Sequence, residues 1–215
     1  MIGQTLAGRY EIIQHLGGGS FGQTFLAKDR QLPGEPYCVV KKLEPQEKDL
    51  NLQIARRLFD TEAVTLQKLG KHNQIPQLLA HFEHNQDFFL VQEFIKGNSL
   101  NNEINSQNIW NESQVIEFLQ DILTVLKFVH DNNVIHRDIK PANLIRRQQD
   151  KKIVLIDFGA VKEIKKTTQV QGNLSLTVGI GTPGYMPSEQ SQGKPKLCSD
   201  IYAVGMIAIQ ALSLI

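Results

Sequence analysis

The sequence has little cysteine, almost no net charge and no long apolar run. Cys38 and Cys198 lie far apart and form no Cys-x-x-Cys or Cys/His cluster. This predicts two buried thiols in a reducing compartment rather than a disulfide or a structural metal site. A formal net charge of +1 gives no support for a nucleic-acid or membrane-surface partner. With 41% hydrophobic residues in 215, the chain can form a sizeable core, as one large domain or two small packed lobes.

Targeting and membrane segments are also lacking. Residues 1–10 contain no basic stretch followed by an apolar run, which argues against a signal peptide. The apolar stretch 203–215 is shorter than the roughly 20 residues that span a bilayer, and it is expected to be a buried core helix. We therefore expect a cytoplasmic protein, with membrane anchoring of a longer parent left open.

Hydrophobic spacing divides the chain into a strand-rich first part and a helix-rich second part. The boundary falls near residues 93–97, which suggests a hinge between two lobes. A long polar loop over residues 160–185 is typical of a functional or disordered segment. The expected strands cover residues 9–16, 24–28, 37–43, 88–95 and 153–156, and the expected helices cover 51–69 and 113–131, the latter with an apolar face of Val115, Ile116, Leu119, Ile122, Leu123, Leu126 and Val129.

A glycine-rich segment lies between the first two expected strands. Gly17, Gly19 and Gly22 form a Gly-x-Gly-x-x-Gly pattern, and glycine lets backbone N–H groups approach phosphates closely. Alone, the pattern is equally typical of a flexible hairpin turn. Its place between two strands, rather than between a strand and a helix, argues against a Rossmann unit and favours a hairpin lid over ATP.

Two charged residues follow this segment. Lys41 ends the apolar run 38–40, from which its ammonium group could reach into a cleft and hold the α- and β-phosphates of a nucleotide. Glu62, on the next expected helix, could pair with Lys41 and aim it. Taken singly, an exposed surface lysine and an exposed helical carboxylate are the more common explanations.

The residues best suited to chemistry lie in the segment 135–144. Asp138 would accept and orient the proton of an attacking hydroxyl, and Lys140 would neutralise charge on a transferring phosphoryl group. Asn143 would bind Mg²⁺ through its carbonyl oxygen. Because Pro141 makes a helix a poor explanation, we expect a shaped loop.

An Asp-Phe-Gly sequence follows the expected strand 153–156. Its Asp157 is a plausible second Mg²⁺ ligand, since magnesium prefers oxygen ligands and shares them with phosphates. A lone Asp-Phe-Gly is a common turn, so its meaning comes from its place after the preceding motif.

Together these motifs resemble the protein kinase family, in the family's order from about Tyr10 to the end of the chain. The resemblance implies an α+β bilobal fold. The N-lobe, residues 1–93, would hold an antiparallel five-stranded sheet and one major helix. Residues 94–97 would form the hinge, and residues 98–215 a mainly helical C-lobe, truncated within its central helix. The motif sequences are most similar to those of bacterial, cyanobacterial-type kinases.

The resemblance also implies roles for single residues. Lys41 and Glu62 would form the activating ion pair, Asp138 with Lys140 would serve catalysis, and the Asp-Ile-Lys-Pro-Ala-Asn wording resembles serine/threonine specificity. ATP and Mg²⁺, or Mn²⁺ in its place, would be the cofactors, with Asn143 and Asp157 as metal ligands. The residues matched to nucleotide binding are Gly17, Gly19, Gly22, Thr24, Val39, Lys41, Glu93, Ile95 and Ile145, with Gln92 at the gatekeeper position.

Some matched positions depart from the family or allow a second explanation. Val39 replaces a small alanine above the adenine, Thr24 replaces a valine, and Ser188 replaces the proline of Ala-Pro-Glu. These changes put the nucleotide fit and one turn in doubt without removing a charged contact. Four residues align with a regulatory hydrophobic spine but are equally well explained as plain core, namely Leu66, Leu78, His136 and Phe158.

The activation loop and the end of the chain carry further expectations. The segment 181–189 resembles the substrate-binding segment, in which Thr182 would contact Asp138 and Lys140. Because the family's C-lobe continues beyond this chain's last residue, Glu189 is expected to lack an arginine partner, and the last helix to expose an apolar patch that lowers stability. Loop phosphorylation paired with Arg137 is a hypothesis, with candidates Thr167, Thr168, Ser175 and Thr177.

Three functions compete at this point. The first is an active enzyme that phosphorylates serine and threonine in protein substrates. The second is a fragment or scaffold that holds nucleotide without turning it over, although Lys41, Asp138, Asn143 and Asp157 are all present. The third, a small-molecule phosphotransferase on a related fold, is disfavoured by the intact His-Arg-Asp sequence and by the segment 181–189.

Overall fold

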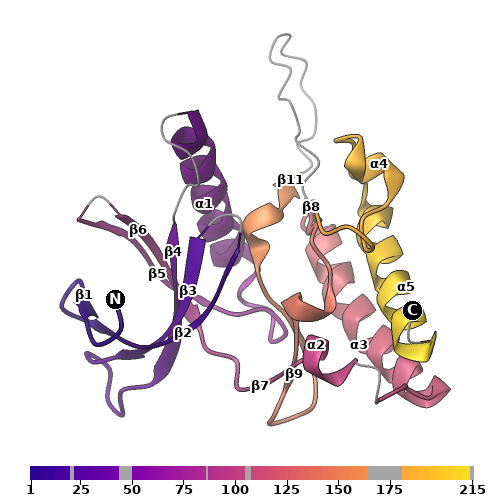
Figure 1. Cartoon of the computed structure of the whole chain (residues 1–215), viewed down its shortest axis with the longest axis horizontal. Helices are drawn as coiled ribbons and strands as arrows, with labels where there is room; N and C mark the ends of the chain where they lie inside the picture. The colour runs from indigo at the N-terminus through magenta and orange to yellow at the C-terminus, as the bar shows by residue number, and fades with distance from the viewer. Residues whose placement is uncertain (20–21, 44–49, 86, 105–107, 164–180, 214–215) are drawn as a thin grey trace. The chain divides into compact units, whose positions relative to one another are not determined.

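The computed structural model describes residues 1–19, 22–43, 50–85, 87–104, 108–163 and 181–213 (Figure 1). It divides into two compact units. The first comprises Met1–Lys71 and Pro76–Ile95, and the second comprises His72–Ile75 and Lys96–Ile215. The short segment 72–75 packs with the second unit, where the side-chain nitrogen of Gln74 donates to the carbonyls of Asp121 and Ile153.

Within the described residues, the first unit is a six-stranded antiparallel sheet with one long helix. The strand order is β1-β2-β3-β4-β6-β5. The strands are β1 (Thr5–Leu6), β2 (Tyr10–Gly19), β3 (Gly22–Asp29), β4 (Tyr37–Leu43), β5 (Leu78–His84) and β6 (Asp87–Glu93), and the helix is α1 (Leu50–Leu69). The sheet has one strand more than the five expected, because the two-residue β1 pairs with the start of β2.

Side-chain alternation explains which residues of this sheet are buried. Phe25, Val40 and Val91 lie opposite one another on β3, β4 and β6, and they join one apolar cluster with Leu6, Tyr10, Ile12, Ala27, Cys38 and Phe89. α1 buries side chains at helical spacing, namely Phe59, Glu62, Ala63, Leu66 and Leu69. The core of this unit therefore follows from period-two strands and one amphipathic helix.

The two cysteines have different surroundings. Cys38 is buried, and its burial raises the pKa of the thiol to about 12. Cys198 is exposed, so the expectation that both thiols are buried is wrong for this residue. It lies in the first turn of a helix whose buried face is made by residues that follow it.

In its described residues, the second unit is mainly helical and carries two small sheets. Its longest helices, α3 (Glu112–Asp131) and α5 (Leu197–Ser213), lie against each other (Figure 1). One sheet has the order β10-β9-β7 and the other pairs β11 with β8. The remaining elements are α2 (Leu100–Glu103), α4 (Ser188–Ser191), β7 (Gly97–Ser99), β8 (Val134–Ile135), β9 (Leu144–Arg147), β10 (Ile153–Leu155), β11 (Lys162–Glu163) and the 3₁₀ turns η1 (Pro141–Asn143) and η2 (Phe158–Ala160).

Local chemistry fixes the start of α3. The side-chain oxygen of Asn111 accepts from the N–H of Gln114, and the side-chain oxygen of Gln114 accepts from the N–H of Asn111, both at 2.9 Å. This reciprocal capping box pairs two amides that would otherwise lack helical partners. The helix therefore begins within one residue of the start that the apolar spacing predicts.

The buried face of α3 differs from the one that the sequence suggested. Ile116 and Leu123 are 46% and 39% exposed, whereas Phe118 and Val125 are fully buried. The physical reason is that apolar residues cover more than one face of α3, and packing selects the stripe of Val115, Phe118, Ile122, Val125, Leu126 and Val129. Periodicity alone could not distinguish these two stripes.

α5 is a core helix of the second unit. It buries Ala203, Val204, Ile207, Ala208 and Ala211, which confirms the expectation that this stretch is core. On its other side it exposes Ile201, Tyr202, Ile209 and Leu212. None of the helices in the described ranges is both long and apolar enough to cross a lipid bilayer.

Gly97 allows β7 and β9 to pack more closely than any other residue would. A Cβ atom at this position would lie 2.2 Å from the carbonyl oxygen of Arg146 and 2.9 Å from Cγ2 of Ile145. Because the first obstacle is backbone, the collision cannot be relieved by a side-chain rotation. The last residue of the expected hinge is thus a glycine because the pairing of β7 with β9 leaves no room for a Cβ atom.

We predict that Gly97→Ala destabilises the second unit by about 1–3 kcal/mol, as overpacking does. Gly205→Ala is the matched control, since a Cβ there meets no atom within 4 Å and alanine favours a helix by up to about 1 kcal/mol. Thermal unfolding followed by circular dichroism compares the two. Equal melting temperatures for both variants would contradict the steric argument.

Candidate active site

The first unit contains the predicted ion pair. Lys41 Nζ on β4 lies 2.5 Å from Glu62 Oε1 on α1. The lysine side chain is 17% exposed and the glutamate side chain 7%. Removing both charges from most of the solvent strengthens their attraction and fixes the lysine's direction. The structure therefore brings together two residues that lie 21 positions apart in the sequence.

Strand register shows which residues share the sheet face of Lys41. Thr24 on β3 and Leu90 on β6 lie opposite Lys41. Val39, two residues before Lys41, lies opposite Gln92. Because side chains alternate along a strand, Thr24, Val39 and Gln92 project from the same face as the lysine.

The glycine segment forms the end of the β2–β3 hairpin. Gly17 pairs with Thr24, and Gly19 pairs with Gly22. Gly17 and Gly22 have φ values of 157° and 150°, in the region that favours glycine. The segment joins two antiparallel strands, as expected, and so does not have the strand-to-helix context of a Rossmann unit.

Gln92 and Glu93 limit what the end of β6 could offer a ligand. Gln92 is 4% exposed, and its Oε1 has no hydrogen-bond partner among the described residues. Glu93 donates its backbone N–H to the carbonyl of Gln77 at 2.9 Å, so this N–H is already paired within the first unit. Ile95 is buried. An unpaired buried acceptor on the Lys41 face fits a ligand that carries a hydrogen-bond donor.

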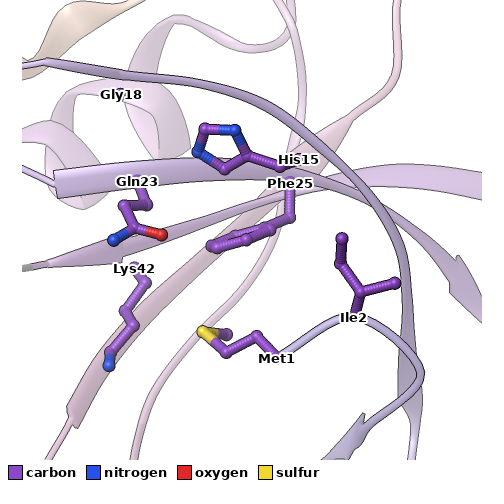
Figure 2. A pocket seen from close by; sticks show the side chains of 7 residues that line it. All are labelled: Met1, Ile2, His15, Gly18, Gln23, Phe25 and Lys42. Atoms are coloured by element: carbon purple, nitrogen blue, oxygen red, sulfur yellow. The ribbon is translucent and has the colours of Figure 1, made fainter.

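A pocket of about 700 Å³ lies on the opposite face of this sheet (Figure 2). Lys42 projects into it from the position next to Lys41, and Gln23, its neighbour on β3, lines it as well. The ring of His15 stands edge-on to Phe25, with centroids 5.2 Å apart. The remaining lining residues are Met1, Ile2 and Gly18. None of the residues expected to bind nucleotide lines this pocket.

In the second unit, three donors converge on the carboxylate of Asp138. The hydroxyl of Thr182 donates to Oδ1 at 2.6 Å, and Asn143 Nδ2 donates to Oδ2 at 3.0 Å. Lys140 Nζ lies 2.9 Å from Oδ2 and also donates to the Thr182 hydroxyl at 2.9 Å. The carboxylate therefore has one fixed orientation, and Thr182 makes both of the contacts expected for it.

The oxygen atoms of Asn143 and Asp157 could hold a divalent metal ion. Asn143 Nδ2 donates to both the backbone and side chain of Asp138, which leaves its side-chain carbonyl oxygen to serve as a ligand. The backbone carbonyl of Asn143 accepts from the N–H of Ile156 at 3.0 Å, next to Asp157. Asp157 has a left-handed backbone, with φ 66° and ψ 76°. One amide and one carboxylate oxygen fit Mg²⁺, which shares its ligands with phosphates.

Other arrangements of metal ligands are not found in the described part of the chain. It contains no group of three or more His, Cys, Asp or Glu side chains that could hold a metal ion. Ile145, the last residue expected to contact nucleotide, lies half-buried on β9, opposite Ser99 and Val154.

The backbone of the loop before Asp138 is held by a buried carboxylate. Asp200, in the first turn of α5, is 1% exposed. Its Oδ2 accepts from the N–H of His136 and its Oδ1 from the N–H of Arg137, both at 2.9 Å. His130 Nε2 lies 2.8 Å from Oδ2. The sequence suggested only a helix start at this position. The signal that could have identified its role is an aspartate at the beginning of an apolar helix.

His136 fills the space behind Asp138 as a neutral ring. It is fully buried, and burial lowers its pKa. Its Nε2 donates to the carbonyl of Ile156 at 3.2 Å, and its Nδ1 accepts from the N–H of Asp138 at 3.3 Å. The ring stands edge-on to Phe158, with centroids 4.9 Å apart. These contacts require the proton on Nε2.

The four residues aligned with the spine are divided between the two units. His136 and Phe158 are fully buried and in contact in the second unit. In the first unit, Leu66 is fully buried and Leu78 half-buried. Burial is common to the spine and plain-core explanations, so both remain open.

Glu189, which was expected to lack an arginine partner, pairs with a serine hydroxyl instead. Its carboxylate accepts from the hydroxyl of Ser199 at 2.7 Å, and this hydrogen bond lowers its pKa. The same Ser199 oxygen accepts from the N–H of Lys196. A hydroxyl at the start of α5 thus pairs with the carboxylate, an alternative that the motif comparison did not consider.

We predict that Asp200→Ala destabilises the protein by about 2–6 kcal/mol, since each of two buried amides left unpaired costs about 1–3 kcal/mol. Asp131→Ala is the control, because the exposed ion pair of Asp131 with Lys127 contributes at most about 0.5 kcal/mol. Urea midpoints measure both effects. If Asp200→Ala unfolds no earlier than the control, the two amides do not depend on this carboxylate.

Comparisons with known proteins agree with this geometry. Residues 10–214 match the protein kinase domain family. Serine/threonine-protein kinase B of Synechocystis is 47% identical over 97% of the chain, and serine/threonine-protein kinase PknA of Nostoc is 46% identical over 98%. Calcium/calmodulin-dependent protein kinase type 1 of Caenorhabditis elegans is 33% identical over 95% of the chain.

These relatives are longer than the chain. It spans 37% of the Synechocystis protein, 38% of the Nostoc protein and 56% of the nematode protein. The similarity therefore covers one region that all three share.

Proposed function

The chain belongs to the protein kinase family, and we propose from this premise that it transfers the γ-phosphoryl group of ATP to serine and threonine hydroxyls of proteins. The observation that carries the proposal is the cluster around Asp138, in which Thr182, Asn143 and Lys140 all contact one carboxylate. Such a carboxylate is suited to orient a hydroxyl and accept its proton.

We assign the roles in the second unit as follows. Asp138 is the base that orients the attacking hydroxyl, and Lys140 neutralises charge on the transferring group. Thr182 and Asn143 fix the carboxylate by donating to its two oxygens. Asn143 and Asp157 would bind the metal ion through oxygen, and that ion, when bound, supplies positive charge to the phosphates. The family uses a divalent ion generally; we propose Mg²⁺, with Mn²⁺ as a substitute.

We assign nucleotide binding in the first unit to the Lys41 face of the sheet. Lys41, aimed by Glu62, would hold the α- and β-phosphates. The hairpin glycines would approach the phosphates with their N–H groups, and Thr24 and Val39 would border the base and sugar. Glu93, Ile95 and Ile145 stay proposed nucleotide contacts. The lobe boundaries at residues 93 and 98, the hinge and a cytoplasmic location likewise stay proposals.

The first test is phosphoryl transfer from γ-labelled ATP to a generic protein substrate, with Mg²⁺ present. We expect the wild type to transfer label and Asp138→Asn to reduce kcat by about 10²–10⁴-fold, the usual contribution of a positioned base. Asp131→Asn, which alters an exposed aspartate on α3, is expected to match the wild type.

The alternatives to this proposal have distinct outcomes. Nucleotide binding without transfer in the wild type would indicate a scaffold that holds ATP. Transfer to small alcohols but not to a Ser/Thr peptide would indicate a small-molecule phosphotransferase. Equal activity of Asp138→Asn and wild type would contradict the role of Asp138.

We also propose autophosphorylation in the loop at Thr167, Thr168, Ser175 or Thr177, residues that lie outside the described ranges. The support is the buried guanidinium of Arg137, whose Nη2 donates to the carbonyl of Val161 at 3.0 Å near the start of this loop. Burial lowers the pKa of Arg137, and a nearby phosphate would favour its charged form.

Mass spectrometry after incubation with Mg-ATP tests this second proposal. We expect phosphate on at least one of the four residues in the wild type and none in Asp138→Asn. Wild-type protein that transfers label to a substrate but carries no loop phosphate after prolonged incubation would rule out autophosphorylation while leaving kinase activity intact.

A further inference from the structure

Gln190 directs a buried amide at the backbone beside the proposed base. It lies in α4 and is 3% exposed. Its Nε2 donates to the backbone carbonyl of Arg137 at 2.6 Å, across 53 residues of sequence. No motif in the sequence singles out this glutamine, since it follows the last residue of the Pro-Ser-Glu segment.

The carbonyl that Gln190 contacts belongs to the peptide group between Arg137 and Asp138. The other polar atom of this group, the N–H of Asp138, donates to His136 Nδ1 at 3.3 Å. Asp200 holds the two preceding amides, those of His136 and Arg137. Because a peptide group is planar, bonds on both of its edges fix the plane from which the Asp138 side chain leaves the backbone.

This peptide group needs to be held, because the residue before it is in an unfavourable conformation. Arg137 has φ 69°, a left-handed backbone that is uncommon for residues other than glycine. Such conformations persist where the surrounding structure imposes them. The bond from Gln190 holds the carbonyl of Arg137, and the carboxylate of Asp200 holds its N–H.

The neighbouring segment is packed tightly against the Gln190 contact. A Cβ atom on Gly181 would lie 2.5 Å from Gln190 Nε2 and 3.1 Å from the carbonyl oxygen of Arg137. The next residue, Thr182, donates its hydroxyl to Asp138 Oδ1. Asp138 is therefore held through its side chain by Thr182 and through its preceding peptide group by Gln190.

We propose that Gln190 is a positioning residue for phosphoryl transfer, acting through the peptide group that precedes Asp138. The inference rests on the proposed kinase function for its kinetic consequence. Its structural core, the orientation of the Arg137–Asp138 peptide group, does not depend on activity. Gln190 couples α4 to the base without touching nucleotide or substrate.

The kinetic test compares Gln190→Met with Gln192→Met. Methionine keeps the length of the side chain but removes the donor, and Gln192 is an exposed glutamine at the end of the same helix. We expect Gln190→Met to lower kcat by about 10- to 100-fold, since small misplacements of reacting groups have effects of this size. The KM for ATP is expected to stay within about twofold, and Gln192→Met to match the wild type.

Gln190→Glu separates positioning from a loss of folded protein. A carboxylate cannot donate to the Arg137 carbonyl, but a protonated carboxyl can. We expect its kcat, relative to that of the wild type, to rise as the pH is lowered from 8 to 6. A pH-independent ratio, with all loss explained by a smaller folded fraction, would overturn the proposal.

Amide hydrogen exchange tests the contact independently of catalysis. In Gln190→Met, we expect exchange at Asp138 to accelerate at least tenfold, while His136, whose amide is held by Asp200, exchanges as in the wild type. Unchanged exchange at Asp138 would overturn the proposal whatever the activity. If the wild type transfers no phosphate but Asp138 exchange still accelerates, the kinase function fails and the positioning contact stands.

Discussion

The carboxylate of Asp200 is the contact on which the geometry of the loop before Asp138 depends. It accepts two consecutive backbone amides in a fully buried site. A buried amide without a partner costs about 1–3 kcal/mol, so the loop has a strong preference for this one arrangement. Because Asp200 lies in the first turn of α5 and α5 lies against α3, the packing of two helices sets the position of a loop about 60 residues earlier in the sequence. The loop before Asp138 therefore depends on the same helix packing that forms the core of the second unit.

Beyond the two amides bound by Asp200, further hydrogen bonds hold the polar atoms of the next residues in the loop. The carboxylate of Asp200 accepts from the amides of residues 136 and 137, and the ring of His136 accepts from the amide of Asp138. Asn143 Nδ2 donates to both the backbone and the side-chain oxygen of Asp138. Each bond leaves fewer directions open to the next residue. Networks of this kind in a low-dielectric interior hold each member more firmly than isolated pairs do. This network requires a neutral His136, because a protonated ring could not accept a hydrogen bond from the N–H of Asp138.

Much of the arrangement could be predicted from the sequence where the determinants are local. The β4 strand and both ends of α1 and α3 lie within one residue of the spacing-based expectation, since strand alternation and the helical period are readable along the chain. β5 was missed because its Leu-Leu-Ala-His-Phe-Glu-His sequence has no β-branched residue. The buried stripe of α3 and the exposure of Cys198 depend on which face of each helix packs against the rest of the second unit. The local spacing of apolar residues does not determine that face.

The contacts of the candidate site likewise divide into those that could be predicted from the sequence and those that could not. Asp138, Lys140 and Asn143 form a local motif, and their mutual contacts follow from the short loop that contains them. The Gln190 contact was not predictable, because it joins segments 53 residues apart. The Ser199–Glu189 pair was not predictable either, because it depends on how the start of α5 packs beside α4. A buried glutamine beside a motif gives no periodic signal, so only its geometry reveals the partner.

Two residues have an unfavourable left-handed backbone at positions where their side chains are needed. Arg137 and Asp157 have φ values of 69° and 66°, conformations that cost of order 1–3 kcal/mol each outside glycine. Glycine would remove this cost, but it would also remove the guanidinium that contacts Val161 and the carboxylate proposed to bind metal. The hydrogen bonds to both backbone polar atoms of Arg137 are of the size needed to offset such a cost. Arg137 therefore keeps its strained backbone where the loop is firmly held, and the bonds that hold it limit where the Asp138 side chain can point.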